Sequence, residues 1–243
     1  MLIQDPAERR ARAEQKRRAI LRFLRDELYT TPQVIGLLLN CAERGTRATL
    51  AAMERDGLLK RHEIKIMPQL PPVVIVGITA QGQGEAYDPD AGEQIRLKAF
   101  EPSRVDLKSI QHTVDTQALR IQSADRWRQW VSTDRLAAAL AGAKKPDAVA
   151  LTASGERVAI ECERHVKTRQ RYETFFAGHL TAIRQRKWSR VVIAAPDEDK
   201  RRRIADALAT IKTCSVQGER IKVDDATRAL FKTCTYDTFP NQL

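Results

Sequence analysis

Three acidic residues, Asp147, Glu161 and Glu163, have the spacing of a carboxylate cluster. They lie in the segment KPDAVALTASGERVAIECERHVKTRQRY, which runs from Lys145 to Tyr172. Residues 153–155 (ASG) suit a three-residue hairpin loop with glycine at its left-handed last position. In that register the numbers of paired residues sum to 308, so Asp147 lies opposite Glu161, about 5 Å away. Glu161 and Glu163 share a face because strand side chains alternate.

Such a cluster can hold a metal ion. Unneutralised carboxylates repel each other and raise their pKa values, and a divalent cation removes that cost. Hard oxygen ligands select Mg²⁺ or Mn²⁺, which would polarise a phosphate and activate a water. Asp147, Glu161 and Glu163 are therefore candidate metal ligands and, with Lys167 to stabilise developing charge, candidate catalytic residues. A surface strand with Glu on its solvent face gives the same pattern, so spacing alone leaves both interpretations open.

Cations follow the acids directly. Between Arg164 and Arg190 a single acid, Glu173, accompanies eight Lys and Arg residues: Arg164, Lys167, Arg169, Arg171, Arg184, Arg186, Lys187 and Arg190. This run favours a polyanionic ligand near the carboxylates. The candidate DNA contacts here are Arg164, Arg169, Arg171 and Tyr172.

The elements around this segment predict a mixed α/β domain over residues 108–243. We expect a helix over 109–124, strands at WRQWV, DAVALTA and RVAIECE, and a helix over 166–186. The apolar strand RVVIAAP and a helix with Ile204, Leu208 and Ile211 on one face follow. The tail from Cys214 onward is ambiguous, and its candidate elements are one strand (RIKV) and a short helix (ATRAL). Residues 88–107 mix Pro, Gly and charge and are predicted to be a linker.

Residues 14–87 predict a winged helix-turn-helix domain. Ile20, Phe23, Leu24 and Leu28 recur at helical spacing. Thr31-Pro32 is typical of a helix start, a third helix from about residue 43 is expected to stop at Gly57, and two strand-like runs follow. In a winged helix the third helix enters the major groove. Candidate DNA contacts are Arg44, Thr46 and Arg47 on that helix, with Lys60, Arg61 and Lys65 along the wing. A small helical domain with a solvated basic face is the alternative.

Composition agrees with a nucleic-acid ligand. The 243 residues include 42 Lys and Arg against 31 Asp and Glu, a formal net charge of +11, which favours a polyanionic partner. No apolar run approaches the roughly 20 residues of a membrane span. The N-terminus has no apolar stretch of a secretory signal. Four dispersed cysteines fit a reducing cytoplasm and no structural zinc. We therefore expect a cytoplasmic protein without a membrane partner.

The acidic segment resembles the PD-(D/E)xK nuclease superfamily, whose pattern is Pro-Asp, a hairpin, and then an acid, one residue and Lys. Here the residues are Pro146-Asp147 and Glu161-Cys162-Glu163, so Glu163 stands at the lysine position and Lys167 is the candidate replacement. The resemblance implies a restriction-endonuclease-like mixed-sheet domain, α/β in class and α+β with the winged helix added. With GTRATLAAMERDGLLKR, GITAQGQ, His112 and Arg171-Tyr172, the chain resembles the replication-relaxation family and its MobC-type plasmid relaxases.

That family resemblance implies a metal-dependent endonuclease that nicks one DNA strand at a plasmid transfer origin during conjugative mobilization. It also implies double-stranded DNA as partner, with single-stranded DNA, a coupling ATPase and an accessory relaxosome protein left open. Tyr172 could attack a phosphate, but such a tyrosine more often stacks or packs. His112 and His165 more often pack or contact phosphate than bind metal. The alternative is a non-catalytic DNA-binding protein of plasmid replication, partition or the relaxosome, and a nuclease making double-strand breaks is a variant of the first hypothesis.

Overall fold

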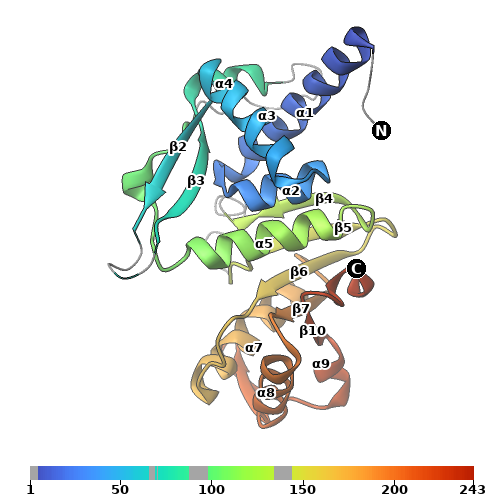
Figure 1. The fold of residues 1–243 in the computed structure, drawn as a ribbon. Helices are drawn as coiled ribbons and strands as arrows, with labels where there is room; N and C mark the ends of the chain where they lie inside the picture. Colours follow the sequence, from blue (N-terminus) through green and yellow to red (C-terminus); the bar gives the residue numbers. More distant parts are fainter. Residues whose placement is uncertain (1–4, 66–68, 70, 88–97, 134–143) are drawn as a thin grey trace. The chain divides into compact units, whose positions relative to one another are not determined.

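The computed structural model describes residues 5–65, 69, 71–87, 98–133 and 144–243, and the chain divides into two compact units. Unit 1 comprises Met1–Ile121 and unit 2 comprises Gln122–Leu243 (Figure 1). Both units combine helices with a β-sheet, which confirms the expected mixture of α and β structure. In the described part of the chain, no helix has the length and apolar character needed to cross a membrane.

Three helices open unit 1, and two of their boundaries follow the sequence signals. Helix α1 spans Pro6–Glu27, α2 spans Pro32–Leu39 and α3 spans Glu43–Arg55. The Thr31 hydroxyl accepts the Val34 N–H at 3.4 Å, so α2 starts at Thr31-Pro32 as predicted. Gly57 has a φ of 73°, which only glycine adopts without strain, and it follows the end of α3 as expected.

A small antiparallel sheet completes this helical arrangement. Its strands are β1 (Tyr29–Thr30), β2 (Leu59–Ile64) and β3 (Val73–Ile78), in the order β1-β3-β2. Helix α4 (Ala80–Glu85) and the 3-10 helix η2 (Pro102–Arg104) follow. The predicted wing corresponds to β2 and β3, while positions 66–68 and 70 of its turn lie outside the described residues. The core of unit 1 includes Ile20, Leu24, Ile35, Leu50, Met53, Leu58, Val76 and Ile78.

Helix α5 (Ile110–Gln122) packs on unit 1, although the sequence pattern predicted it in the second domain. Gln117 accepts a hydrogen bond from Thr30 at 2.6 Å and donates to the Tyr29 carbonyl at 2.8 Å. Arg120 pairs with Glu27 at 2.6 Å and with Asp26 at 3.1 Å. These polar contacts decide where α5 belongs, and an apolar periodicity cannot reveal them. Of the predicted linker, 88–97 lie outside the described residues.

Unit 2 is built on a five-stranded mixed sheet. Its strands are β4 (Trp127–Ser132), β5 (Ala148–Thr152), β6 (Arg157–Cys162), β7 (Arg190–Ala195) and β10 (Phe231–Thr235), in the order β10-β7-β6-β5-β4. The β4-β5 and β5-β6 pairs are antiparallel, whereas β7 runs parallel to both β6 and β10. The strand β10 was not predicted, because FKTCT carries no alternating pattern.

The helices of unit 2 cover this sheet. Helix α7 (Arg169–Arg184) and helix α8 (Glu198–Ala209) flank β7 in the sequence, and their apolar faces share one core with it (Figure 1). The tail forms a hairpin of β8 (Thr213–Val216) and β9 (Glu219–Lys222), then α9 (Asp225–Ala229). A 3-10 helix, η3 (Phe239–Gln242), ends the chain. Both tail elements that the sequence left open, the RIKV strand and the ATRAL helix, are therefore present.

The β5-β6 hairpin has the predicted register. Ala148 pairs with Ile160 and Leu151 with Arg157, so paired residue numbers sum to 308. Gly155 has a φ of 88°, and its N–H bonds to the Thr152 carbonyl at 3.0 Å. The left-handed glycine therefore fixes the turn, and the turn places the acidic residues of β6 opposite the start of β5.

Replacing Gly155 with alanine should lower the free energy of unfolding of unit 2 by about 1 kcal/mol, because an L-residue is strained at this φ. A Cβ at this position meets no atom within 4 Å, so the effect is on the backbone alone. Urea unfolding followed by tryptophan fluorescence measures it, since all three tryptophans lie in unit 2. Gly155→Asn is the control, because asparagine tolerates this conformation better; equal losses in both variants would contradict the explanation.

Candidate active site

The three predicted carboxylates lie where β5 starts and β6 ends, and we call this end of the two strands the sheet edge. Asp147 directly precedes β5, Glu161 lies in β6 and Glu163 follows β6. The Asp147 N–H bonds to the Ile160 carbonyl at 3.0 Å. Its carboxylate Oδ2 accepts the Cys162 N–H at 2.7 Å. Asp147 is therefore tied to Cys162, the residue between the two glutamates.

Glu161 is a buried carboxylate with two nitrogen partners. Its side chain is 6% exposed. The Oε1 atom lies 2.8 Å from His179 Nε2 and 3.0 Å from Lys144 Nζ. Helix α7 supplies His179, and the segment before β5 supplies Lys144. Oε2 forms no hydrogen bond with any residue that the structure describes.

His179 is fully buried among aromatic rings. Its ring centroid is 4.5 Å from that of Phe175 and 5.5 Å from that of Trp188. Its Nδ1 has no hydrogen-bond partner among the described residues. This arrangement fits a neutral ring that donates its single N–H from Nε2 to Glu161. Burial lowers the pKa of His179 against the opposing influence of Glu161.

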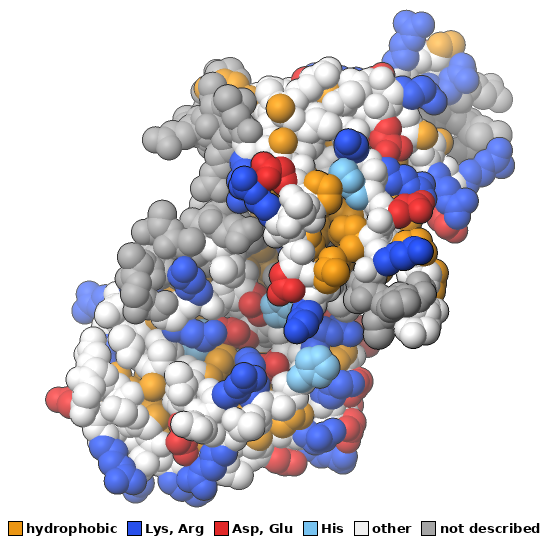
Figure 2. Space-filling model, turned by 90° about the vertical axis from the view of Figure 1, so that its left-hand side faces the viewer, with side chains coloured by type: hydrophobic (Ala, Val, Ile, Leu, Met, Phe, Trp, Pro, Cys, Tyr) orange, Lys and Arg blue, Asp and Glu red, His pale blue; other side chains and the backbone are white. Residues whose placement is uncertain are grey.

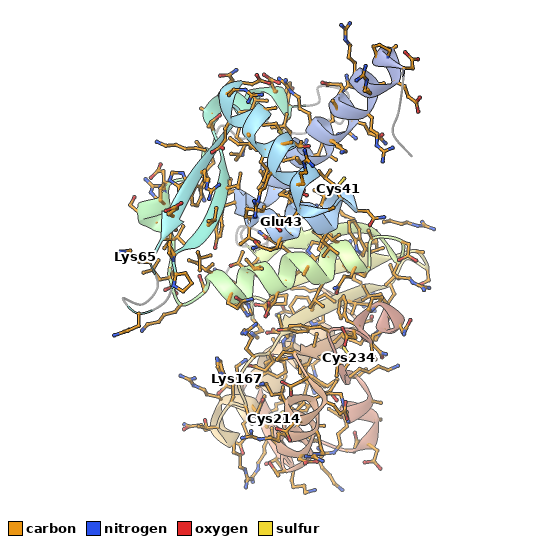
Figure 3. All side chains as sticks on the ribbon, viewed as in Figure 1. Cys41, Glu43, Lys65, Lys167, Cys214 and Cys234 are labelled. Carbon is orange, nitrogen blue, oxygen red and sulfur yellow. The ribbon has the colours of Figure 1, made fainter. Side chains whose placement is uncertain are left out.

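Glu163 forms an ion pair with Lys167, four residues further along the chain. The glutamate side chain is buried, and Lys167 is partly exposed; Figure 3 labels Lys167 in the segment that leads into α7. Lys167 Nζ also lies 5.5 Å from the centre of the Phe175 ring, and Lys144 Nζ lies 5.4 Å from it. The two ammonium groups that pair with the glutamates therefore lie near the same aromatic ring.

The environment shifts the pKa values of the two glutamates in opposite directions. Burial alone would raise the pKa of Glu161, but the His179 hydrogen bond and the Lys144 charge hold it well below its usual range. Burial raises the pKa of Glu163, the nearby Glu161 charge adds to this, and Lys167 only partly opposes it. The Lys167 pKa rises because its two glutamate neighbours outweigh its own burial. Glu161 is thus a fixed anion, and Glu163 can exchange a proton more readily.

Helix α7 contains a glycine where Lys144 passes. A Cβ on Gly178 would lie 2.9 Å from Lys144 Cβ and 3.3 Å from its Cγ, which is too close for both. A glycine inside a helix costs about 1 kcal/mol relative to alanine. Here it leaves space for the lysine side chain to reach Glu161.

The site has donors of the type that the expected metal ion needs, but these donors do not converge on one position. Three carboxylates offer hard oxygens of the kind that Mg²⁺ and Mn²⁺ prefer. Within the described ranges, no group of three His, Cys, Asp or Glu side chains is positioned to hold a metal ion. The glutamates bind Lys144 and Lys167 instead, and Glu161 Oε2 is one carboxylate oxygen that has no hydrogen-bond partner among the described residues.

Tyr172 does not lie on the surface, which corrects its assignment as a DNA contact. The residue is 1% exposed on α7, and its hydroxyl accepts the Lys167 N–H at 3.3 Å. Its ring packs edge-on against Phe175. Tyr172 therefore supports the loop that carries Lys167, and neither base stacking nor attack on a phosphate is open to it in this arrangement.

The other predicted contacts near the site are more accessible. Arg169 and Arg171 are exposed at the start of α7, and Arg169 pairs with Glu173 at 3.0 Å. Arg164 is half-buried, and His165 is exposed. His112 lies on α5, within unit 1, so it is not a residue of the unit 2 sheet edge.

In unit 1, the predicted recognition helix α3 presents a basic face. Arg44 and Arg47 are exposed, and Arg55 extends the same face because it follows at helical spacing. Arg47 also pairs with Glu43, which Figure 3 labels at the start of α3. Lys60 and Arg61 on β2, and Lys65 after it, are exposed as expected. On the face drawn in Figure 2, Lys and Arg side chains lie over both units.

Thr46 is the exception on α3 and corrects a second assignment. It is 2% exposed, and its hydroxyl bonds to the Ala42 carbonyl at 3.3 Å. A Cβ on Gly36 of α2 would meet the Thr46 hydroxyl at 3.4 Å. Thr46 therefore packs between two helices and does not reach a DNA surface.

Two residues of this site, Lys144 and His179, were not predicted. Lys144 precedes the Pro-Asp pair and reads as one of many surface cations. His179 lies on the apolar face of α7 and reads as a core residue. The sequence held one indirect signal of the Lys144 contact. Gly178 lies in the middle of a predicted helix, and a glycine there often marks the close approach of another segment.

Comparison with known proteins identified no similar protein. A scan of family models found no match, and neither the curated proteins nor the solved structures gave a significant match. The site is therefore interpreted from its own geometry.

A double-mutant cycle should detect the Lys144–Glu161 interaction. Lys144→Ala should lower the free energy of unfolding by about 1–2 kcal/mol, because it leaves a buried carboxylate with one cation fewer. In a Glu161→Gln background the same change should cost clearly less, since the charge is gone. Urea unfolding at pH 7, followed by tryptophan fluorescence, measures both.

The pH dependence supplies the control for that cycle. The folded pKa of Glu161 lies below its ordinary value of 4.5. Its contribution to stability is therefore complete above about pH 4.5 and is lost as the pH falls through the folded value. The coupling energy should be equal at pH 7 and pH 6, and equal costs of Lys144→Ala in both backgrounds would contradict the interaction.

Proposed function

We propose that the protein is a metal-dependent DNA endonuclease of relaxase type, which nicks one strand at a plasmid transfer origin. The observation that carries the proposal is the buried, ionised Glu161 at the same sheet edge as Asp147, with a protonatable carboxyl and two lysines beside it. The strand order and the parallel β6-β7 pair support a nuclease-like unit, and the helix order with its hairpin supports a winged helix in unit 1. The cytoplasm is the compartment that we propose for it.

Each side chain of the site would have its own role in phosphodiester hydrolysis. Asp147, Glu161 and Glu163 would hold Mg²⁺ or Mn²⁺, which when bound polarises the phosphate. Glu163, with its raised pKa, would accept a proton from the attacking water as that oxygen bonds to phosphorus. The bond from phosphorus to the leaving sugar oxygen breaks, and this oxygen takes up a proton from solvent water. Lys167 and Lys144 would stabilise the extra negative charge on the phosphate.

DNA binding by unit 1 is the second part of the proposal. Arg44 and Arg47 on α3 would lie in the major groove, and Lys60, Arg61 and Lys65 would follow the backbone of double-stranded DNA. Arg164, Arg169 and Arg171 of unit 2 would hold the strand to be cut, also where it is single-stranded. A coupling ATPase and an accessory relaxosome protein are the further partners that conjugative mobilization would require.

A second function is favoured by one observation. Each glutamate already has a lysine ion pair, and Glu163 stands where the nuclease pattern has lysine. An arrangement that is neutral without a metal ion suits a non-catalytic DNA-binding protein of plasmid replication or of the relaxosome. In that case the unit 2 cations would only bind the DNA backbone.

Nicking of a plasmid separates the two functions. The substrate is a supercoiled plasmid that carries the DNA flanking the protein's own gene, incubated with Mg²⁺, Mn²⁺ or EDTA. We expect metal-dependent conversion to open circles, slowed about 100-fold or more by Glu161→Gln, which removes the charge but keeps the shape. Glu198→Gln, the same change at an exposed acid on α8 outside the site, should nick like the wild type.

The products distinguish the remaining outcomes. Tight DNA binding without any open circles would exclude the endonuclease and support the non-catalytic function. Linear plasmid would indicate a nuclease that cuts both strands. Equal rates for Glu161→Gln and the wild type would place the catalytic site elsewhere.

The α3 face can be tested by binding alone. Arg44→Ala with Arg47→Ala should weaken binding to the flanking DNA by about 10-fold or more at 150 mM salt, because two base or phosphate contacts are lost. Fluorescence anisotropy with a labelled duplex measures the dissociation constant. Arg202→Ala with Arg203→Ala on α8 removes the same charge as a control, and equal effects of the two pairs would exclude a specific role for α3.

A further inference from the structure

The first half of α1 extends away from the rest of unit 1 (Figure 1). Every residue from 6 to 15 is exposed, whereas Ile20, Leu21, Phe23 and Leu24 in the second half are buried in the core. Asp5 caps the helix by accepting the Ala7 N–H at 2.9 Å, and Pro6 occupies its first turn. We call residues 6–19 the basic arm. It is a formed helix, about 20 Å long at 1.5 Å per residue.

Part of the arm's positive charge has no acidic partner among the described residues, whereas Arg17 pairs with Asp56 and Glu85. Arg9, Arg10, Arg12 and Lys16 have no side-chain partner among the described residues. The acids of the arm are Glu8 and Glu14, and Glu14 is paired with Arg18 at 2.8 Å. Arg9, Arg12 and Lys16 recur at i, i+3 and i+7, so they lie along one face. Figure 3 shows side chains at the free end of the arm that point into open space.

This charge is placed against the preference of the helix itself. The N-terminal end of a helix has a partial positive charge, which disfavours cations in the first turns. Arg9, Arg10 and Arg12 lie within two turns of the start. An anion bound there would remove the repulsion and would also interact with the helix end. The arrangement therefore favours an anionic ligand.

The arm's composition excludes other common occupants. Its apolar side chains are alanines and one proline, at positions 6, 7, 11, 13 and 19. A coiled-coil partner needs large apolar residues at every third and fourth position. A helix that lies in a membrane surface needs Trp, Phe or Leu on one face. Neither is present, whereas a regular row of phosphates complements a row of cations.

We propose that the basic arm binds the phosphate backbone of double-stranded DNA, independently of sequence, beside the site that unit 1 recognises. The inference rests on the proposed DNA binding and adds a surface outside the winged-helix contacts. Because the arm is already helical, few backbone conformations are lost on binding. Each cation that meets a phosphate releases counterions, so the arm contributes directly to salt dependence.

The test is the salt dependence of binding to a labelled 30-base-pair duplex of arbitrary sequence. In the full-length protein, Arg9→Ala, Arg12→Ala and Lys16→Ala together should weaken binding at 100 mM salt by more than 10-fold. The slope of log K against log salt concentration should become shallower by about 2 to 3, because three phosphate contacts are lost. Alanine preserves the helix, which circular dichroism verifies.

The control removes the same number of charges from α8, by Lys200→Ala, Arg202→Ala and Arg203→Ala. These residues pair with acids of their own helix, so we expect the wild-type slope. Wild-type binding with an unchanged slope in the arm variant would overturn the proposal and leave the winged-helix contacts standing. If the wild-type protein bound no duplex, both the arm proposal and the proposed DNA binding by unit 1 would be overturned. Arm-dependent sedimentation with phosphatidylserine vesicles, without a change in the DNA slope, would make a membrane the ligand instead.

Discussion

The buried charge of Glu161 is the constraint on which unit 2 depends. An ionised carboxylate out of water costs several kcal/mol unless it is paired and hydrogen-bonded. One oxygen of Glu161 receives both partners, His179 from α7 and Lys144 from the segment before β5. These contacts fix α7 against β6 and bring the lysine across Gly178. The partners of one side chain therefore connect three elements, and this is why a polar cluster can lie beside an aromatic core.

The same constraint separates two glutamates that are only two residues apart. Glu161 is stabilised as an anion, while burial and the neighbouring charge favour the protonated form of Glu163. Two carboxyl groups with pKa values displaced in opposite directions can act as a fixed charge and a proton acceptor. Lys144 and Lys167 make the cluster nearly neutral without a metal ion. A divalent cation would therefore compete with lysine for these oxygens, so metal affinity and lysine position are coupled.

The sequence predicted what depends on neighbouring residues in the chain. The Thr31-Pro32 start, the Gly57 stop and the Gly155 turn are local signals, and the turn alone determined which residues of β5 and β6 face each other. Which helix residues are buried was harder to predict. Thr46 and Tyr172 are polar or amphipathic, and only the packing shows that they point inward. Lys144, His179 and the place of α5 depend on contacts between distant segments. No spacing in the sequence records such contacts.

The pairing of charges indicates where a polyanion can bind more directly than the net charge of the chain does. On α8, Lys200, Arg201 and Arg202 each contact an acid three residues earlier, so this helix is rich in cations but nearly neutral. The basic arm has a similar density of cations, and four of them have no acidic partner among the described residues. Exposed pairs on one helix contribute little to stability, but they do neutralise each other toward a distant phosphate. The net charge of +11 is thus distributed unevenly, and it is available to a polyanion in segments where the cations have few acidic neighbours.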